Sequence, residues 1–394
     1  MDYLSNYFIS NNTLQAIANS VKNQTGTTDK ITISQMVDKI DSVRNETVNQ
    51  IITGECSSFS NDFITKIAEY KFYYRTNLIE VDLPAVTDVA ALAFAGSGVN
   101  AVNLPNATSL GNQAFSYCNS LTDITFNNVL TVGQSCFSEC EQLTAVNFPV
   151  ATEFGQSAFY KCTMLTDINA PLLTTINSRA FEYCSSIVSF DSPNVSSILG
   201  SAFQYCSKLE NVNLPSVTTI GSYCFKGTKL SSVDNMPLLT SIPESAFSSC
   251  GSLKSVFFPE VTHISQYGFS SCSNLVDVKM PKLTSVDKMG FYWCSSLQKI
   301  DLPSLTSING VSVFSACNAL TALILRSETM CKLETADALN GTSYHGPTPI
   351  ESGTGYIYVP ATLIDTYKAD SVWSTFATQI RAIEDYPDIC STNE

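Results

Sequence analysis

The sequence predicts a solenoid of short β-rich coils, and three observations support this fold class. Phenylalanine recurs with a period of about 22 residues, at positions 72, 94, 115, 137, 159, 181, 203, 225, 247, 269, 291 and 314. Ten of the fifteen prolines follow the same period, from Pro84 to Pro303. Cysteine follows the repeat phenylalanine by three positions in most units. A unit of this length cannot bury its apolar side alone, so about 12 coils of 22 residues must stack to share one core.

Each unit supplies one short strand, one turn and one buried aromatic ring. The aligned units read L-x-x-V-x-L/F-P-x-V/L-T-x-I-x-x-x-A-F-x-x-C, as in residues 209–225. The alternating apolar residues at the start predict a strand with one inward face. Proline ends that strand because it has no N–H to donate to a neighbour. The later phenylalanine, the small residue before it and the cysteine after it are expected to fill the far side of the core.

This pattern resembles the BspA-like leucine-rich repeat family over about two thirds of the chain. The segments that carry the resemblance include LPSVTTIG, SAFQYCSKLENVNLP and GFYWCSSLQKIDLP. The resemblance implies a β-rich leucine-rich repeat solenoid and a protein that binds other molecules.

Composition excludes several classes of partner. The net charge of −14 argues against nucleic acid or an anionic membrane as the main partner. No apolar run is long enough to cross a membrane, and the first residues lack a basic region followed by an apolar one, so neither membrane insertion nor a secretory signal is expected. Ser, Thr and Asn supply most of the polar surface, which suits a protein outside the cytosol or in a particle.

The fourteen cysteines are predicted to be reduced core residues. Equivalent positions in stacked coils lie about 4.8 Å apart, whereas the Cβ atoms of a disulfide lie about 3.8 Å apart. Nine cysteines occupy such equivalent positions, at 118, 140, 162, 184, 206, 250, 272, 294 and 317.

Residues 1–50 are predicted to form a short helical module. Apolar residues at helical spacing mark two amphipathic helices, and the positions expected to contact a partner are Leu14, Ile17, Val21, Met36 and Ile40. Residues 14–43 resemble the N-terminal module of bacteriophage and prophage tail-associated structural proteins. The resemblance implies attachment to other virion or tail proteins; the alternative is a helical cap on the solenoid.

The remaining boundaries divide the chain into a lead-in with a degenerate repeat at 51–77, the solenoid at 78–325 and a mixed α/β cap at 326–394. Within the cap, residues 328–339, 361–368 and 372–380 are expected to be helical, and residues 356–359 are expected to form a strand that closes the last edge of the sheet. Glycines near 96, 227 and 310 are expected to absorb one-residue changes in the repeat through their conformational freedom.

No catalytic residue, metal site or cofactor is predicted. The two histidines, His263 and His345, are far apart in the sequence, and no nucleophile motif is present. We expect His263 to be a solvated surface residue.

Candidate ligand-binding residues are those that the repeat leaves facing outward. One set consists of amides and a carboxylate on the strand face: Asn147, Asn169, Asp191 and Asn213. The other is an aromatic ridge beside the cysteines: Tyr117, Tyr160, Tyr183, Tyr205, Tyr292 and Trp293. Aromatic rings beside amides suit a sugar or a peptide, although tyrosines at the edge of a solenoid also serve in packing.

The sequence therefore favours a non-enzymatic binding and adhesion protein. In the first hypothesis it is a phage tail-associated virion protein that presents the solenoid to a cell-surface glycan or protein. The alternative is a bacterial cell-surface or secreted BspA-like adhesin. A homo-oligomer is compatible with both.

Overall fold

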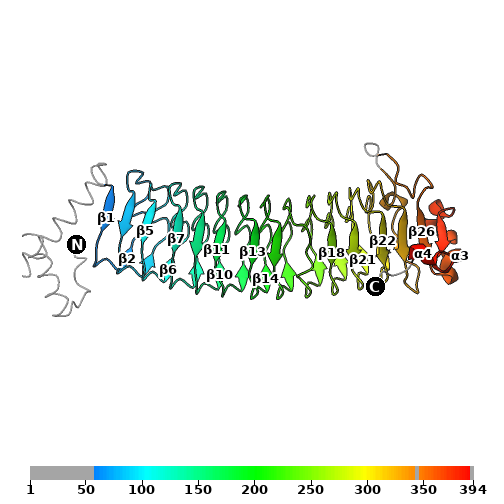
Figure 1. Cartoon of the computed structure of the whole chain (residues 1–394), viewed down its shortest axis with the longest axis horizontal. Coiled ribbons are helices and arrows are strands. Elements are labelled where there is room, and N and C mark those ends of the chain that lie inside the picture. The colour runs from blue at the N-terminus through cyan, green and yellow to red at the C-terminus, as the bar shows by residue number, and fades with distance from the viewer. Residues whose placement is uncertain (1–56, 342–345, 391–394) are drawn as a thin grey trace, which may run out of the picture.

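The computed structural model describes residues 57–341 and 346–390, where the chain forms an elongated parallel β-solenoid (Figure 1). The predicted fold class is therefore confirmed. The N-terminal module, with Leu14, Ile17, Val21, Met36 and Ile40, lies outside the described residues, as does His345.

Each regular coil contributes two parallel strands to two different faces of the solenoid. The first strands form the first-strand face: β1 Ser58–Ser60, β3 Glu80–Asp82, β5 Ala101–Asn103, β7 Asp123–Thr125, β9 Ala145–Asn147, β11 Asp167–Asn169, β13 Ser189–Asp191, β15 Asn211–Asn213, β18 Ser255–Phe257, β20 Asp277–Lys279, β22 Lys299–Leu302 and β24 Ala322–Leu325. The second strands form the second-strand face: β2 Lys66–Ile67, β4 Asp88–Val89, β6 Ser109–Leu110, β8 Thr131–Val132, β10 Glu153–Phe154, β12 Thr175–Ile176, β14 Ser197–Ile198, β16 Thr219–Ile220, β17 Ser241–Ile242, β19 His263–Ile264, β21 Ser285–Val286, β23 Ser307–Ile308 and β25 Lys332–Leu333.

Strand pairing keeps equivalent residues of successive coils side by side. Asp167, Ile168 and Asn169 of β11, for example, pair with Ala145, Val146 and Asn147 of β9. In the three-residue first strands the middle residue points inward, and its two neighbours point outward. Each repeat position therefore becomes a continuous file of side chains along the solenoid.

Stacked phenylalanine rings form the centre of the core. Phe181 is fully buried, and its ring stacks on Phe159 and Phe203 with centroid distances of 5.5 and 5.3 Å. Proline opens the tight turn that follows the first strand: Val217 N–H donates to the Leu214 carbonyl across Pro215. Proline suits that position because its fixed φ matches the second residue of such a turn.

The nine repeat cysteines are all buried and unbridged, as predicted. Burial raises the pKa of these thiols, for Cys118 and Cys317 to about 12. They are therefore packing groups of the core and not exposed nucleophiles.

The turn around each repeat phenylalanine has an unusual backbone. Every non-glycine residue with a positive φ in the described chain lies two positions before or two positions after a repeat phenylalanine. At Phe115, for example, the N–H groups of Gln113, Phe115 and Tyr117 all donate to carbonyls of the next coil. These hydrogen bonds, which run along the solenoid axis, offset the cost of the left-handed conformation.

Two of the glycines expected to absorb changes in repeat length lie at this turn. Gly96 and Gly227 have φ values of +67° and +71°, but the same position is left-handed in other coils, where it is occupied by residues such as Glu139. A Cβ atom on Gly227 would lie 2.7 Å from the ring of Tyr205, and one on Gly96 would lie 2.9 Å from the ring of Tyr74. At both positions the ring of a tyrosine in the preceding coil packs closely against the glycine, in the space that a Cβ atom would enter.

The C-terminal cap continues the solenoid and adds short helices at its end (Figure 1). β26 Tyr356–Val359 pairs with β24, and β27 Ile380–Ala382 pairs with β26. The helical elements are η1 Ala336–Ala338, η2 Ala361–Leu363, α3 Ile364–Ala369, η3 Trp373–Phe376, η4 Ile383–Asp385 and α4 Pro387–Cys390.

Two details of the cap differ from expectation. Residues 328–339 contain strand β25 and only one turn of 3-10 helix, because Lys332 and Leu333 continue the second-strand sheet beside β23. The strand predicted at 356–359 exists but does not close the edge, since β27 pairs beyond it.

Candidate binding surfaces

The outward amides of the first-strand face bond to one another across coils. Asn169 Nδ2 donates to Asn147 Oδ1 at 2.6 Å, and Asn213 Nδ2 donates to Asp191 Oδ1 at 2.9 Å. These bonds explain why short polar side chains persist on strands that otherwise disfavour them. The four predicted residues thus form two bonded pairs, and ligand binding by them stays a prediction.

The six predicted aromatic residues occupy two different files of the phenylalanine turn. Tyr160 and Tyr292 directly follow a repeat phenylalanine; Tyr117, Tyr183, Tyr205 and Trp293 stand one position later, in the left-handed conformation. Both files lie on the turn, whereas the predicted amides lie on the first strands. The predicted aromatic ridge is therefore divided into two files, and both are separate from the amides of the first strands.

Three of these rings contact one another, and we call Tyr160, Tyr183 and Tyr205 the tyrosine cluster. Tyr183 stacks on Tyr205 with ring centroids 5.0 Å apart, and Tyr160 meets Tyr183 edge-on at 6.0 Å. Tyr117 is separated from the cluster by the coil of Phe137. Tyr292 and Trp293 are separated from it by three coils that carry smaller or charged residues at these positions.

Charged side chains surround the tyrosine cluster. The guanidinium of Arg179 lies 4.8 Å from the centre of the Tyr160 ring, and the ammonium of Lys161 lies 5.3 Å from it. Arg179 pairs with the buried carboxylate of Glu182, and Lys161 pairs with Glu139 at 3.4 Å. The cations are therefore held over the ring by their carboxylate partners.

Tyr205 has little free ring face. Tyr183 of the preceding coil covers one side, and the backbone of Gly227 in the next coil lies against the other. The cluster consequently presents ring edges and hydroxyl groups to solvent.

Sequence reasoning missed a third file, two positions before each repeat phenylalanine. Arg179, Tyr223 and Tyr267 occupy this file in three different coils, each at the turn around its own repeat phenylalanine. The Tyr223 hydroxyl donates to Glu244 at 2.6 Å. The repeat spacing could have revealed this file, because each of these residues stands two positions before a repeat phenylalanine.

A groove of about 590 Å³ lies on the first-strand face near its C-terminal end. Its charged lining is mixed: Lys279 pairs with Asp277 at 3.7 Å and Arg326 pairs with Asp301 at 2.7 Å, beside Lys299 and the apolar Phe257 and Val276. It was not predicted, because it depends on residues that depart from the repeat.

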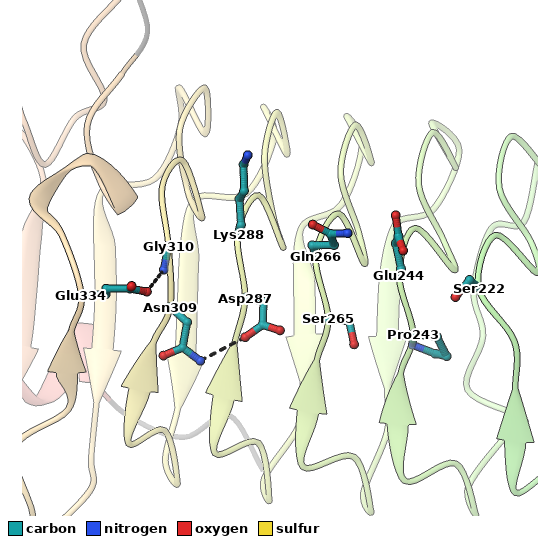
Figure 2. A pocket seen from close by; sticks show the side chains of 10 residues that line it. All are labelled: Ser222, Pro243, Glu244, Ser265, Gln266, Asp287, Lys288, Asn309, Gly310 and Glu334. Atoms are coloured by element: carbon teal, nitrogen blue, oxygen red, sulfur yellow. Dashed lines mark hydrogen bonds between the residues drawn. The ribbon is translucent and has the colours of Figure 1, made fainter.

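A second, shallower groove of about 560 Å³ crosses successive coils just past the ends of the second strands (Figure 2). Asn309 Nδ2 donates to Asp287 Oδ1 at 3.0 Å within it, and the Gly310 N–H donates to Glu334. Apart from Pro243 and Gly310 its lining side chains are polar or charged, and these two hydrogen bonds each join one coil to the next.

His263 lies beside this second groove and is less solvated than expected. Its Nδ1 lies 2.7 Å from Ser285 Oγ, and its Nε2 lies 3.2 Å from Asp287 Oδ2. The three residue types match a hydrolytic triad, but the His263 and Asp287 side chains are 37% and 34% exposed on an open sheet. Such a hydrated surface lacks the water-excluded setting that stabilises a developing oxyanion, so the contacts serve to pair the coils.

The described residues contain neither a metal-binding cluster nor a membrane-spanning helix. No group of three or more His, Cys, Asp or Glu side chains within residues 57–341 and 346–390 could hold a metal ion. In the same ranges, no helix combines the length and apolar character needed to cross a membrane.

Fold and surface together define a class of protein: an extended β-solenoid scaffold whose variable side chains lie on repeated, solvent-facing files. The family comparison is more specific. The family model described as "BspA type Leucine rich repeat region (6 copies)" matches residues 55–166, 131–254 and 240–336. The chain belongs to the BspA-type leucine-rich repeat family.

One solved structure shows the same fold at low sequence identity. A leucine-rich repeat protein from Bacteroides ovatus is 19% identical, with 84% of each chain covered and a TM-score of 0.56. A leucine-rich cell surface protein from Faecalibacterium prausnitzii is 24% identical, with 73% of this chain and 87% of that chain covered and a TM-score of 0.43. No curated protein matches the chain.

Proposed function

We propose that this chain is a non-enzymatic adhesion protein, surface-bound or secreted, that binds a protein partner through the tyrosine cluster. Membership of the BspA-type family supports a binding role. The observation that carries the proposal is the contact between the exposed ring of Tyr183 and the partly buried ring of Tyr205. Tyrosine combines apolar area with a hydrogen-bonding hydroxyl and few rotatable bonds, and it is enriched at protein interfaces.

The covered ring faces favour a protein partner over a glycan. A sugar ring stacks on an open aromatic face, whereas both faces of Tyr205 are occupied. Ring edges, hydroxyls and the flanking Arg179 and Lys161 suit the mixed polar and apolar surface of a protein.

Adsorption of the labelled protein to epithelial and bacterial cells tests this function. Replacing Tyr183 and Tyr205 with serine is expected to reduce adsorption at least about tenfold, as loss of a central aromatic pair does at interfaces. Tyr70→Ser, which removes an exposed ring from the first coil, is the matched control and is expected to adsorb normally. Trypsin treatment of the cells is expected to abolish adsorption; periodate treatment, which destroys glycans, is expected to leave it. The opposite pattern would assign the partner to the glycans.

The resemblance of residues 14–43 to phage tail modules supports a second assignment, to the virion. In that case a chain that lacks residues 1–44 retains adsorption to cells but is lost from purified phage particles of the strain that encodes it. Absence of the full-length chain from those particles, together with its presence on the cell surface, would rule out the virion assignment.

A further inference from the structure

Arg179 and Glu182 are single departures from the repeat, and both belong to the coil of Phe181. Arg179 is the only charged residue in the file two positions before the repeat phenylalanines, which carries residues such as Ser157 and Ser201 in neighbouring coils. Glu182 is the only carboxylate in the file directly after these phenylalanines. The two residues pair with each other beside the tyrosine cluster. The repeat itself therefore does not require this ion pair.

The two charges of the pair are unequally exposed. Glu182 is the only charged side chain that is buried in the described part of the chain, and 8% of its side chain is exposed, whereas the Arg179 side chain is 46% exposed. Lys282 and Glu260, by contrast, pair at 56% and 44% exposure, so both of their charges reach the surface. The pair of Arg179 thus presents its positive end to solvent and keeps its negative end inside.

The guanidinium of Arg179 is held in place and still has free donors. Its Nε donates to Glu182, and its Cζ lies 4.8 Å from the centre of the Tyr160 ring. No hydrogen bond within residues 57–341 and 346–390 uses its Nη1 or Nη2. Arg326 differs, because its Nη2 is already bonded to Asp301. Two adjacent nitrogens of Arg179 are therefore free on an ordered side chain, which is the arrangement that binds a carboxylate through both oxygens.

We propose that Arg179 binds an aspartate or glutamate side chain of the partner protein, and that Glu182 is a positioning residue for this contact. The inference rests on the function proposed above, because it assigns a charged contact and its chemistry to the same site. Tyrosine and arginine are the residue types that most often dominate binding at protein interfaces. An arginine that is already ordered also loses less conformational entropy when it binds.

Titration of cells with the labelled protein measures the contribution of Arg179. Arg179→Gln is expected to weaken adsorption about tenfold or more. Arg179→Lys is expected to weaken it at least about threefold, because an ammonium lacks the planar pair of donors. Arg381→Gln is the matched control: Arg381 also lies over a tyrosine ring, that of Tyr356, but in the C-terminal cap. It is expected to stay within about twofold of the parent.

Glu182→Gln tests whether Glu182 acts through Arg179. We expect adsorption to weaken about threefold or more, and no further loss when this change is added to Arg179→Gln. The double variant leaves no unpaired charge buried, so it remains a valid test where Arg179→Gln alone is unstable. Thermal unfolding of each variant establishes that it is folded.

Chemical treatment of the cells identifies the group that Arg179 binds. Carbodiimide with ethanolamine converts surface carboxylates into neutral amides. We expect this treatment to weaken adsorption of the parent protein about tenfold and to leave the residual adsorption of Arg179→Gln unchanged.

Three results would overturn this inference. Normal adsorption of the Arg179→Gln, Glu182→Gln double variant, with adsorption lost in the Tyr183→Ser, Tyr205→Ser variant, would keep the proposed function and leave the ion pair a structural role. Full adsorption to amidated cells would show that the bound group is not a carboxylate. Adsorption that survives trypsin but not amidation would assign the carboxylate to an acidic glycan. Normal adsorption of both double variants would overturn the proposed function as well.

Discussion

The thiol of Cys184 donates a hydrogen bond to the carbonyl oxygen of Phe159, 3.0 Å away in the preceding coil. The same contact joins Cys206 to Phe181 and Cys294 to Phe269. The cysteine column is thus a set of bonds between coils as well as a filling of the core. Because the thiols are buried, we expect Ellman's reagent to label none of the nine repeat cysteines in the native protein and all of them after unfolding in urea without reductant. Intact disulfides among the nine would contradict this arrangement.

Stability is expected to fall at alkaline pH for the same reason. Burial raises the pKa of Cys250 to about 11 and that of Cys118 to about 12 in the folded chain. The stabilisation is complete below the thiol pKa of the unfolded chain, about 8.5, and is lost as pH rises toward the folded values. Between these two pKa values, each buried thiol lowers the free energy of unfolding by about 1.4 kcal/mol per pH unit. Urea unfolding at pH 7 and pH 9 measures the loss, and the double variant Cys184→Ala, Cys206→Ala should show a shallower dependence on pH.

Phe181→Ala and Tyr183→Ala separate the inward and outward files of one turn. Phe181 is fully buried between Phe159 and Phe203, so its truncation is expected to cost about 3–5 kcal/mol. Tyr183 is 38% exposed, and its truncation is expected to cost under about 1 kcal/mol. Equal losses in urea unfolding would mean that the outward ring is a core residue.

Gly227→Ala tests whether Tyr205 dictates the glycine. The added Cβ would lie 2.7 Å from the Tyr205 ring, so we expect a loss of about 1–3 kcal/mol. In a Tyr205→Ala background the ring is gone, and the cost should fall below about 1 kcal/mol. A double-mutant cycle by urea unfolding measures the coupling. If Gly227→Ala costs the same stability with and without the Tyr205 ring, the left-handed backbone of Gly227 would explain the need for glycine instead.

Trp373 and Tyr367 anchor the C-terminal cap to the solenoid. Trp373 Nε1 donates to the Cys331 carbonyl at 2.7 Å, and the Cys331 N–H donates to the Tyr367 hydroxyl at 2.7 Å. Tyr367→Phe leaves that buried N–H unpaired and is expected to cost about 1–3 kcal/mol. Tyr386→Phe, at a ring that is 37% exposed, is the control and should change stability by under about 0.5 kcal/mol. Thermal unfolding of both variants checks the difference.

The repeat made the core predictable, because a fixed period places each phenylalanine, cysteine and strand residue on one file. The same period reveals little about features that depart from it. Phe257 and Lys279 can be read as exceptions in the sequence, but only the register of β18 and β20 shows that they are adjacent. The division of the aromatic ridge depends on the backbone at Tyr183, whose φ of 63° no residue preference predicts.

Contacts made by single residues far apart in the chain lie beyond pattern reasoning as well. Strand β25 forms because Lys332 and Leu333 extend an existing sheet, although residues 328–339 read as helical. Arg326 reaches Asp301 and the Cys390 carbonyl, and no spacing rule connects these positions.

The thiol column also sets a time limit on folding. An unfolded chain exposes fourteen cysteines at once, and the repeat spaces most of them evenly, so many wrong disulfides are sterically open to it. In the folded solenoid the thirteen cysteines within the described residues are buried, out of reach of oxidants. Outside a reducing cytosol, the chain must therefore stack its coils faster than its thiols oxidise, and each coil that docks removes its cysteine from that competition.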